Sequence, residues 1–203
     1  MTWKLYSSPR SPFVRKVMIA VHELGLQDMI ERQDVTTTPM NPAPELLPAN
    51  PLGMIPTLIV NDQPIFDSLT IMRYLDAQAQ GGLFAAPGED YAMLTRHAMA
   101  SGAMDKAVRI LDEQFRTQND DTAEHISGFV EAIRRAISWM EPRLSADRFD
   151  AADICFAALI SYLEMRFPQH FWMDHAPAAR AWYDEVAKRP SMQATAFAAP
   201  PFV

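Results

Sequence analysis

The chain has 203 residues, of which 49% are hydrophobic and 21% are charged, and its formal net charge is −7. This composition is ordinary for a globular protein with a sizeable core, so it excludes a disordered chain and a disulfide-dense scaffold. The acidic balance argues against a nucleic-acid partner, because phosphate binding needs a concentrated basic surface. No run of about eighteen apolar residues occurs, so we expect neither a membrane-spanning helix nor a membrane partner.

Cys155 is the only cysteine, so disulfide exchange between two protein thiols is excluded and a cytoplasmic location is expected. The N-terminal residues 1–6 lack the basic and apolar regions of a signal peptide. The five histidines form no HExxH motif or close ligand pair, so we expect no metal. No GxSxG elbow indicates a serine hydrolase.

Residues 1–80 alternate between strand-like and helix-like patterns, which predicts an α/β domain. Residues 3–6 form a short strand. Ser11 and Pro12 then open a helix, because serine is a favoured N-cap and proline is favoured at the first helical position. Apolar residues at positions 14, 17, 18, 21 and 24 form one stripe on this helix, and Gly25 closes it. A second strand falls near residues 30–35.

Six prolines between positions 39 and 56 exclude a regular helix through most of that segment. Residues 57–60, 61–63 and 64–66 then follow the pattern of strand, turn and strand. Ser68 is predicted to cap a further helix with apolar residues at positions 69, 71, 72 and 75. The predicted order is therefore βαβ, an irregular segment and ββα.

Residues 81–88 are the predicted linker between a first domain at 1–80 and a second domain at 89–203. The second domain shows no strand pattern, and we expect helices at about 90–118, 122–146, 151–166 and 175–188. Asp150 is the predicted cap of the third of these helices, and Asp153 adds a second acidic group at its positive end. The apolar tail from residue 190 to 203 is expected to pack back on the body as coil.

Three local motifs carry the functional information. In the first, residues 5–15, Ser11 stands at the predicted helix start, four residues before Arg15. The second is the proline-containing segment at residues 50–58, and the third is the pair at 67–68. With these motifs in this order, the chain resembles the cytosolic glutathione S-transferases of the serine type, over essentially its whole length. The resemblance implies an α/β thioredoxin-like N-terminal domain followed by an all-α C-terminal helical domain.

The resemblance also implies a glutathione-dependent transferase, with glutathione as cosubstrate, a small electrophile as second substrate, no metal, and a homodimeric assembly. A free thiol has a pKa near 8.5, so only a few per cent is ionised at about pH 7. A hydroxyl donor at the positive end of a helix lowers that pKa, so Ser11 is the predicted catalytic residue. Tyr6 is a rival for this role and Ser7 and Ser8 are lesser ones, while the alternative reading of Ser11 is an ordinary N-cap.

By the same resemblance, the glutathione site is completed by Phe13, Ile55, Pro56, Asp67 and Ser68. The Ile55–Pro56 bond is expected to be cis, which directs the main chain of Ile55 toward the cysteinyl part of glutathione. The Asp67 carboxylate suits the ammonium of the γ-glutamyl end, and the Ser68 hydroxyl with the helix amides suits its carboxylate. Met54 departs from the lysine or glutamine that many relatives carry to contact the glycyl end.

The electrophile site is expected, by resemblance, to be lined by the loop at Arg10 and by the helix around residues 99–115. Arg96 and Arg109 are candidates for an anionic substrate, against the alternative of a solvated helix face. Conjugation, isomerisation and ether or halide cleavage stay open, but thiol–disulfide reduction is disfavoured because Ser11 stands where a cysteine is needed. The alternative function is a non-catalytic module of the same fold that binds other proteins.

Overall fold

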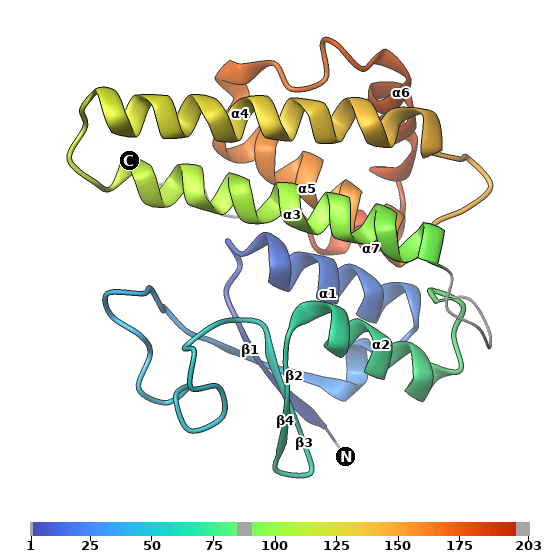
Figure 1. Ribbon diagram of the computed structural model, residues 1–203. Coiled ribbons are helices and arrows are strands. Elements are labelled where there is room, and N and C mark those ends of the chain that lie inside the picture. The colour runs from blue at the N-terminus through green and yellow to red at the C-terminus, as the bar shows by residue number, and fades with distance from the viewer. Residues whose placement is uncertain (1, 85–90, 198–203) are drawn as a thin grey trace. The chain divides into compact units, whose positions relative to one another are not determined.

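The computed structural model describes residues 2–84 and 91–197, which divide into two compact units. The first unit holds residues 2–84 together with the C-terminal segment 189–197, and the second holds residues 91–188. The first contains a four-stranded sheet with helices, and the second contains only helices and turns among its described residues (Figure 1). The expected fold class is therefore confirmed. Within the described ranges, no helix has the length and apolar character needed to span a membrane.

The sheet of the first unit has the strand order β2–β1–β3–β4. Its strands are β1 (Trp3–Ser7), β2 (Ile30–Asp34), β3 (Thr57–Val60) and β4 (Gln63–Ile65). β2 is parallel to β1, so the chain must cross over between them, whereas β3 is antiparallel to both β1 and β4. Asn61 and Asp62 join β3 to β4 with φ angles of 48° and 64°, the left-handed geometry of a tight hairpin turn. The four predicted strands are thus confirmed.

The crossover helix α1 (Pro12–Glu23) begins and ends where the sequence predicts. Ser11 is its N-cap, and Gly25, with a φ of 67°, follows its C-terminal end. The short 3₁₀ turn Gln27–Met29 then leads into β2. Burial on α1 is wider than the single predicted stripe, because α1 packs against both α2 (Ser68–Ala79) and α7 (Pro190–Ala194).

The helix α7 corrects the expectation that the C-terminal tail is coil. Residues 190–194 are helical, and proline at the first position favours a helix start there. Arg189 donates from Nε and Nη2 to the two carboxylate oxygens of Glu23 at 2.9 Å and 2.7 Å, and the Ser191 hydroxyl donates to the same carboxylate. Arg15 donates from Nη2 to the carbonyl of Met192 at 3.2 Å. Side chains of α1 that lie more than 160 residues earlier in the chain therefore hold this segment in place.

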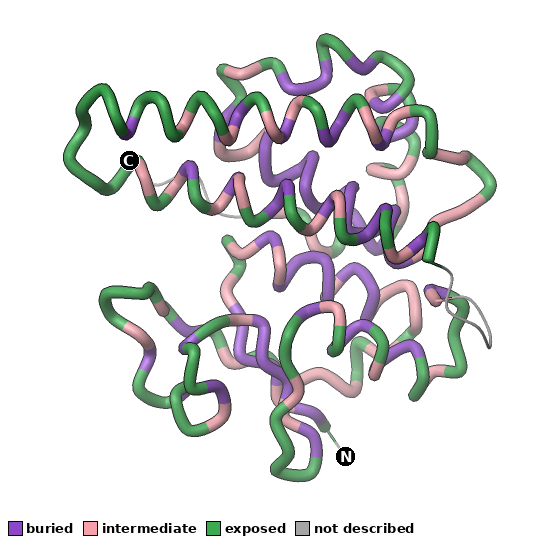
Figure 2. The backbone as a smooth tube through the Cα atoms, viewed as in Figure 1, coloured by how far each residue is buried: buried purple, intermediate pink, exposed green. Residues whose placement is uncertain are grey.

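The second unit is built from α3 (Tyr91–Gln114), α4 (Asp120–Met140), α5 (Ala151–Arg166) and α6 (Pro177–Val186), with 3₁₀ turns at Glu141–Arg143 and Pro168–His170. α5 is buried from Ala151 to Leu163 and packs against α3, as the purple helix inside this unit shows (Figure 2). Asp150 and Asp153 form a capping box at its start, so the predicted cap is confirmed. α4 ends earlier than predicted, because Pro142 cannot continue the helical hydrogen bonding.

The contact of Glu23 with Arg189 gives a pH-dependent prediction. Burial raises the pKa of Glu23, but the hydrogen bonds from Arg189 and Ser191 outweigh it and the net pKa is lowered. A carboxyl whose pKa is lowered by folding stabilises the protein above its unfolded-state pKa, and this is lost as the pH falls through the lower folded value. We expect Glu23→Gln to lower the free energy of unfolding by about 1–2 kcal/mol at neutral pH.

The difference between Glu23→Gln and the wild type is expected to shrink as the pH falls below about 4.3. Urea unfolding at a series of pH values measures it, with Glu45→Gln as control because Glu45 is an exposed glutamate of the same unit. An unchanged free energy of unfolding at neutral pH would show that α7 is not held through this carboxylate.

Candidate active site

The strand directions bring the three sequence motifs to one edge of the sheet. Tyr6 pairs with Thr57 and Leu58 pairs with Ile65, both in antiparallel register. Continuing each register beyond the strand ends places Pro56 across from Ser7 on one side and across from Asp67 on the other. β1 and β4 are both antiparallel to β3, so they run in the same direction and the helices that follow them begin at the same edge. The chain therefore gathers the loop leading to Ser11, the Pro56 turn and the start of α2.

Ser11 lies half-buried at the N-terminus of α1 and combines two roles. Its Oγ accepts a hydrogen bond from the main-chain N–H of Val14 at 3.2 Å, which is the N-cap interaction. No described residue accepts a hydrogen bond from the Ser11 hydroxyl, so its proton is available to a ligand at the positive end of the helix. The two alternative readings of Ser11, cap and donor, are thus compatible in one side chain. Phe13 lies half-buried in the same turn, with the Lys16 ammonium 5.3 Å from its ring centroid.

The Ile55–Pro56 peptide bond is cis, as expected. Buried polar side chains hold the turn before it: Asn50 donates from Nδ2 to the carbonyl of Met54 and to the hydroxyl of Thr57, both at 3.0 Å. The Thr57 hydroxyl in turn donates to the same carbonyl at 2.9 Å. Within the described ranges, the main-chain N–H and C=O of Ile55 have no hydrogen-bond partner, so both are available to an extended ligand. Sequence reasoning missed the supporting role of Asn50 and Thr57, although both lie within the second motif.

At the start of α2, the cap is Asp67 and not Ser68, which corrects the prediction. Asp67 has extended backbone angles, and its Oδ1 accepts from the main-chain N–H groups of Leu69 and Thr70 at 3.1 Å and 3.2 Å. Ser68 is the first helical residue and is buried. Aspartate and serine are equally good N-caps, so composition does not decide between neighbours. Among the described residues, nothing bonds to the second oxygen of Asp67, Oδ2, and the side chain is exposed.

The rivals of Ser11 are engaged elsewhere. Tyr6 is buried and packs in a cluster with Val35, Ala43 and Leu46. Ser7 is fully buried, and its hydroxyl donates to the carboxylate of Asp34. Ser8 lies in the loop itself, where its Oγ accepts from the main-chain N–H of Arg10 at 3.4 Å. These placements favour Ser11 as the hydroxyl that faces a ligand.

In the second unit, Arg96 is neither a substrate ligand nor part of a solvated face, which corrects both readings. It is buried, and its Nη1 lies 2.9 Å from Asp153 Oδ1, while its Nη2 bonds Asp150 at 2.5 Å. A buried guanidinium with two carboxylate partners serves the fold, because removing one partner would leave an uncompensated buried charge. Arg109 is exposed and pairs with Asp105 one helical turn away, which agrees with a solvated face.

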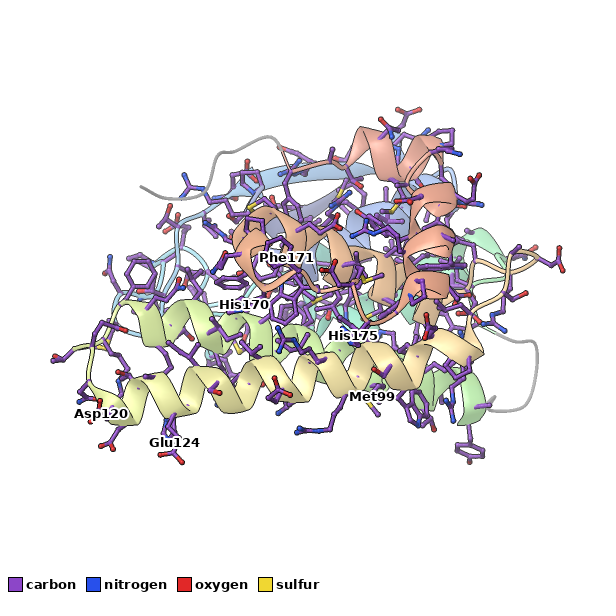
Figure 3. The ribbon with its side chains drawn as sticks, turned by 90° about the horizontal axis from the view of Figure 1, so that it is seen from above. Met99, Asp120, Glu124, His170, Phe171 and His175 are labelled. Atoms are coloured by element: carbon purple, nitrogen blue, oxygen red, sulfur yellow. The ribbon has the colours of Figure 1, made fainter. Side chains whose placement is uncertain are left out.

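The second unit also holds a pocket of about 470 Å³ where α3 meets α4, lined by residues that include Glu113, Arg116, Asn119 and His125. Glu124 belongs to its lining, and the side chains of Asp120 and Glu124 extend outward from the first turns of α4 (Figure 3). None of the residues predicted for the glutathione site lines this pocket, whereas Glu113 belongs to the stretch 99–115 that was expected to line the electrophile site. Over residues 2–84 and 91–197, no group of three or more His, Cys, Asp or Glu side chains could hold a metal ion.

Comparison with known proteins identifies the family. The profile of the glutathione S-transferase N-terminal domain matches residues 10–78, and that of the C-terminal domain matches residues 123–185. A glutathione transferase family member from Pseudomonas fluorescens Pf-5, solved with bound glutathione, is 36% identical over 99% of this chain and 100% of its own, with a TM-score of 0.92. The same family member with bound S-(propanoic acid)-glutathione gives 35% identity over 98% and 100%, and a TM-score of 0.87. Glutathione S-transferase 3 from Zea mays is 28% identical over 97% of this chain and 94% of its own. The chain belongs to the glutathione S-transferase family.

Proposed function

We propose that this protein activates the thiol of glutathione with the Ser11 hydroxyl, for attack on a small electrophile. As a glutathione S-transferase, the protein is an enzyme with glutathione as its cosubstrate. One observation carries the assignment of Ser11. Its hydroxyl oxygen accepts a hydrogen bond from the Val14 N–H, but no described residue accepts a hydrogen bond from its proton. No observation on this chain favours the non-catalytic module considered from the sequence.

The chemical demand on Ser11 is modest and matches what its position offers. Lowering the thiol pKa by about two units makes the thiolate the majority form at pH 7 and corresponds to about 2.7 kcal/mol. A hydrogen bond to an ionised acceptor contributes about 1.5–3 kcal/mol, and a helix N-terminus adds about 0.3–1 kcal/mol. Together these two effects suffice for the shift. Ser11 then acts as a hydrogen-bond donor that stabilises the thiolate, while the nucleophile is the glutathione sulfur.

The binding mode follows from the groups left open at this edge of the sheet. The main chain of Ile55 pairs with the cysteinyl part of glutathione as an added strand would. Asp67 keeps Oδ1 on its own helix and offers Oδ2 to the γ-glutamyl ammonium. The main-chain N–H and the hydroxyl of Ser68 receive the γ-glutamyl carboxylate, because the N–H groups of Leu69 and Thr70 already donate to Asp67 Oδ1.

The proposal also covers the class of the second substrate, the oligomeric state and the cellular location. The second substrate is a small electrophile, as the resemblance implies. The protein acts as a homodimer, as the resemblance implies and as is commonest for soluble oligomers. A cytoplasmic location is supported by the single, buried cysteine.

The role of Asp67 is tested by separating its charge from its cap. Asp67→Asn keeps a side-chain oxygen for the N-cap but removes the negative charge, so we expect an unchanged melting temperature and about tenfold weaker glutathione binding. Asp67→Ala removes both and is expected to lower stability by about 1 kcal/mol as well. Calorimetric titration with reduced glutathione and thermal unfolding measure the two effects. Wild-type glutathione affinity in Asp67→Asn would rule out the ammonium contact.

The role of Ser11 is tested with Ser11→Gly, because glycine costs only a few tenths of a kcal/mol as an N-cap but has no hydroxyl. We expect the pKa of the bound thiol to rise by about one to two units, with a roughly 10- to 100-fold lower kcat/KM at neutral pH. Ultraviolet absorbance of the thiolate across pH measures the pKa. Ser8→Ala is the control, since Ser8 is a hydroxyl residue of the same loop. An unchanged thiol pKa in Ser11→Gly would exclude Ser11 as the activating donor.

A further inference from the structure

Three polar side chains form a closed group at the C-terminal ends of β1 and β2. Ser7 and Asp34 are paired in the parallel register of the two strands, and Arg32 lies two residues before Asp34 on the same face. The Ser7 hydroxyl donates to Asp34 Oδ1 and accepts from Arg32 Nε at 3.3 Å. Arg32 Nη2 also donates to Asp34 Oδ1 at 3.0 Å. Each of the three side chains therefore contacts the other two.

The three side chains differ in how far they are buried, and this difference decides which of their bonds contributes most to stability. Ser7 is 0% exposed, whereas the side chains of Arg32 and Asp34 are 40% and 53% exposed. An exposed ion pair such as Arg32 with Asp34 contributes little by itself, at most about 1 kcal/mol. A buried hydroxyl that donates to a carboxylate makes one of the stronger hydrogen bonds, and without that acceptor it would stay unsatisfied. The group therefore fixes the position of Ser7.

The main chain connects Ser7 to the proposed thiol activator over a very short path. The Ser7 carbonyl accepts from the N–H of Val35 at 2.9 Å, so both the side chain and the main chain of Ser7 are bonded to the β2 end. Residues 8–10 then lead directly to Ser11, whose N–H donates to the Ser8 carbonyl at 3.2 Å. A connection of three residues has a short reach, so a displacement of Ser7 also displaces the start of α1.

We propose that Ser7, held by Asp34 and Arg32, is a positioning residue that sets the place of the Ser11 hydroxyl relative to the glutathione sulfur. This inference rests on the proposed function of Ser11. Hydrogen bonds weaken steeply with distance and angle, so a small shift of Ser11 raises the pKa of the bound thiol even though Ser7 does not touch it. A purely structural role for Ser7 would change stability and leave that pKa as it is.

The test compares Ser7→Ala, Asp34→Ala and the double variant. Asp34→Ala is the safer of the two single changes, because the half-exposed Asp34 side chain leaves no cavity. The readouts are the pKa of bound glutathione, from thiolate absorbance, and the free energy of unfolding, from urea titration. Asp34→Asn keeps an acceptor oxygen and is expected to restore part of the wild-type pKa. Glu31→Ala is the matched control, since Glu31 is an exposed acidic residue of the same strand.

We expect each single variant to raise the thiol pKa by about half to one unit, a three- to tenfold loss of thiolate at a pH below it, with no further rise in the double variant. Glu31→Ala should leave the pKa at the wild-type value. Ser11→Gly, measured alongside, separates the two proposals. If Ser11→Gly raises the thiol pKa but Ser7→Ala and Asp34→Ala do not, the positioning role of Ser7 is overturned while the proposed function stands. If Ser11→Gly leaves the pKa unchanged, the proposed function fails and this inference falls with it.

Discussion

The antiparallel placement of β3 between β1 and β4 is the constraint on which the candidate site depends. It makes β1 and β4 run in the same direction, so the helices that follow them start at one edge of the sheet. It also starts β3 at that edge, directly after the cis bond at Pro56. Main-chain pairing, not contact between the functional side chains, therefore assembles the site.

Both helices at this edge reuse their capping residues. A helix N-terminus needs acceptors for its first N–H groups, and Ser11 and Asp67 each supply one oxygen for that purpose. Each also has one group that bonds to no described residue, namely the hydroxyl proton of Ser11 and the Oδ2 of Asp67. Because the cap already fixes the side-chain rotamer, a ligand that binds this group has little further conformational entropy to remove. Helix capping thus preorganises the side chains that would bind glutathione.

Most of the structure that was predicted correctly depends on local sequence signals. The start of α1 at Ser11 and Pro12, the turn between β3 and β4, and the cap at Asp150 each depend on residues within a few positions of one another. Two of the errors come from contacts between distant residues, since the helix at 190–194 is held by Glu23 and Arg15, and Arg96 is neutralised by carboxylates more than fifty residues away. Two others are local, because the cap of α2 lies at Asp67 and not at the neighbouring Ser68, and Pro142 ends α4 earlier than expected. The bond between Ser7 and Asp34 is equally invisible in sequence, because only the strand register brings those two positions together.

Several charged side chains are bonded within the protein, and this limits how glutathione can be held. Glu23 and Arg96 have protein partners, and Arg15 bonds the carbonyl of Met192. Met54 is 59% exposed and offers no charge to the glycyl end. Under the proposed binding mode, specific recognition then comes from the γ-glutamyl end at Asp67 and from the main chain of Ile55. We infer that most of the glutathione affinity comes from the α2 end of the site. The glycyl end of glutathione is then the part that the protein recognises least specifically.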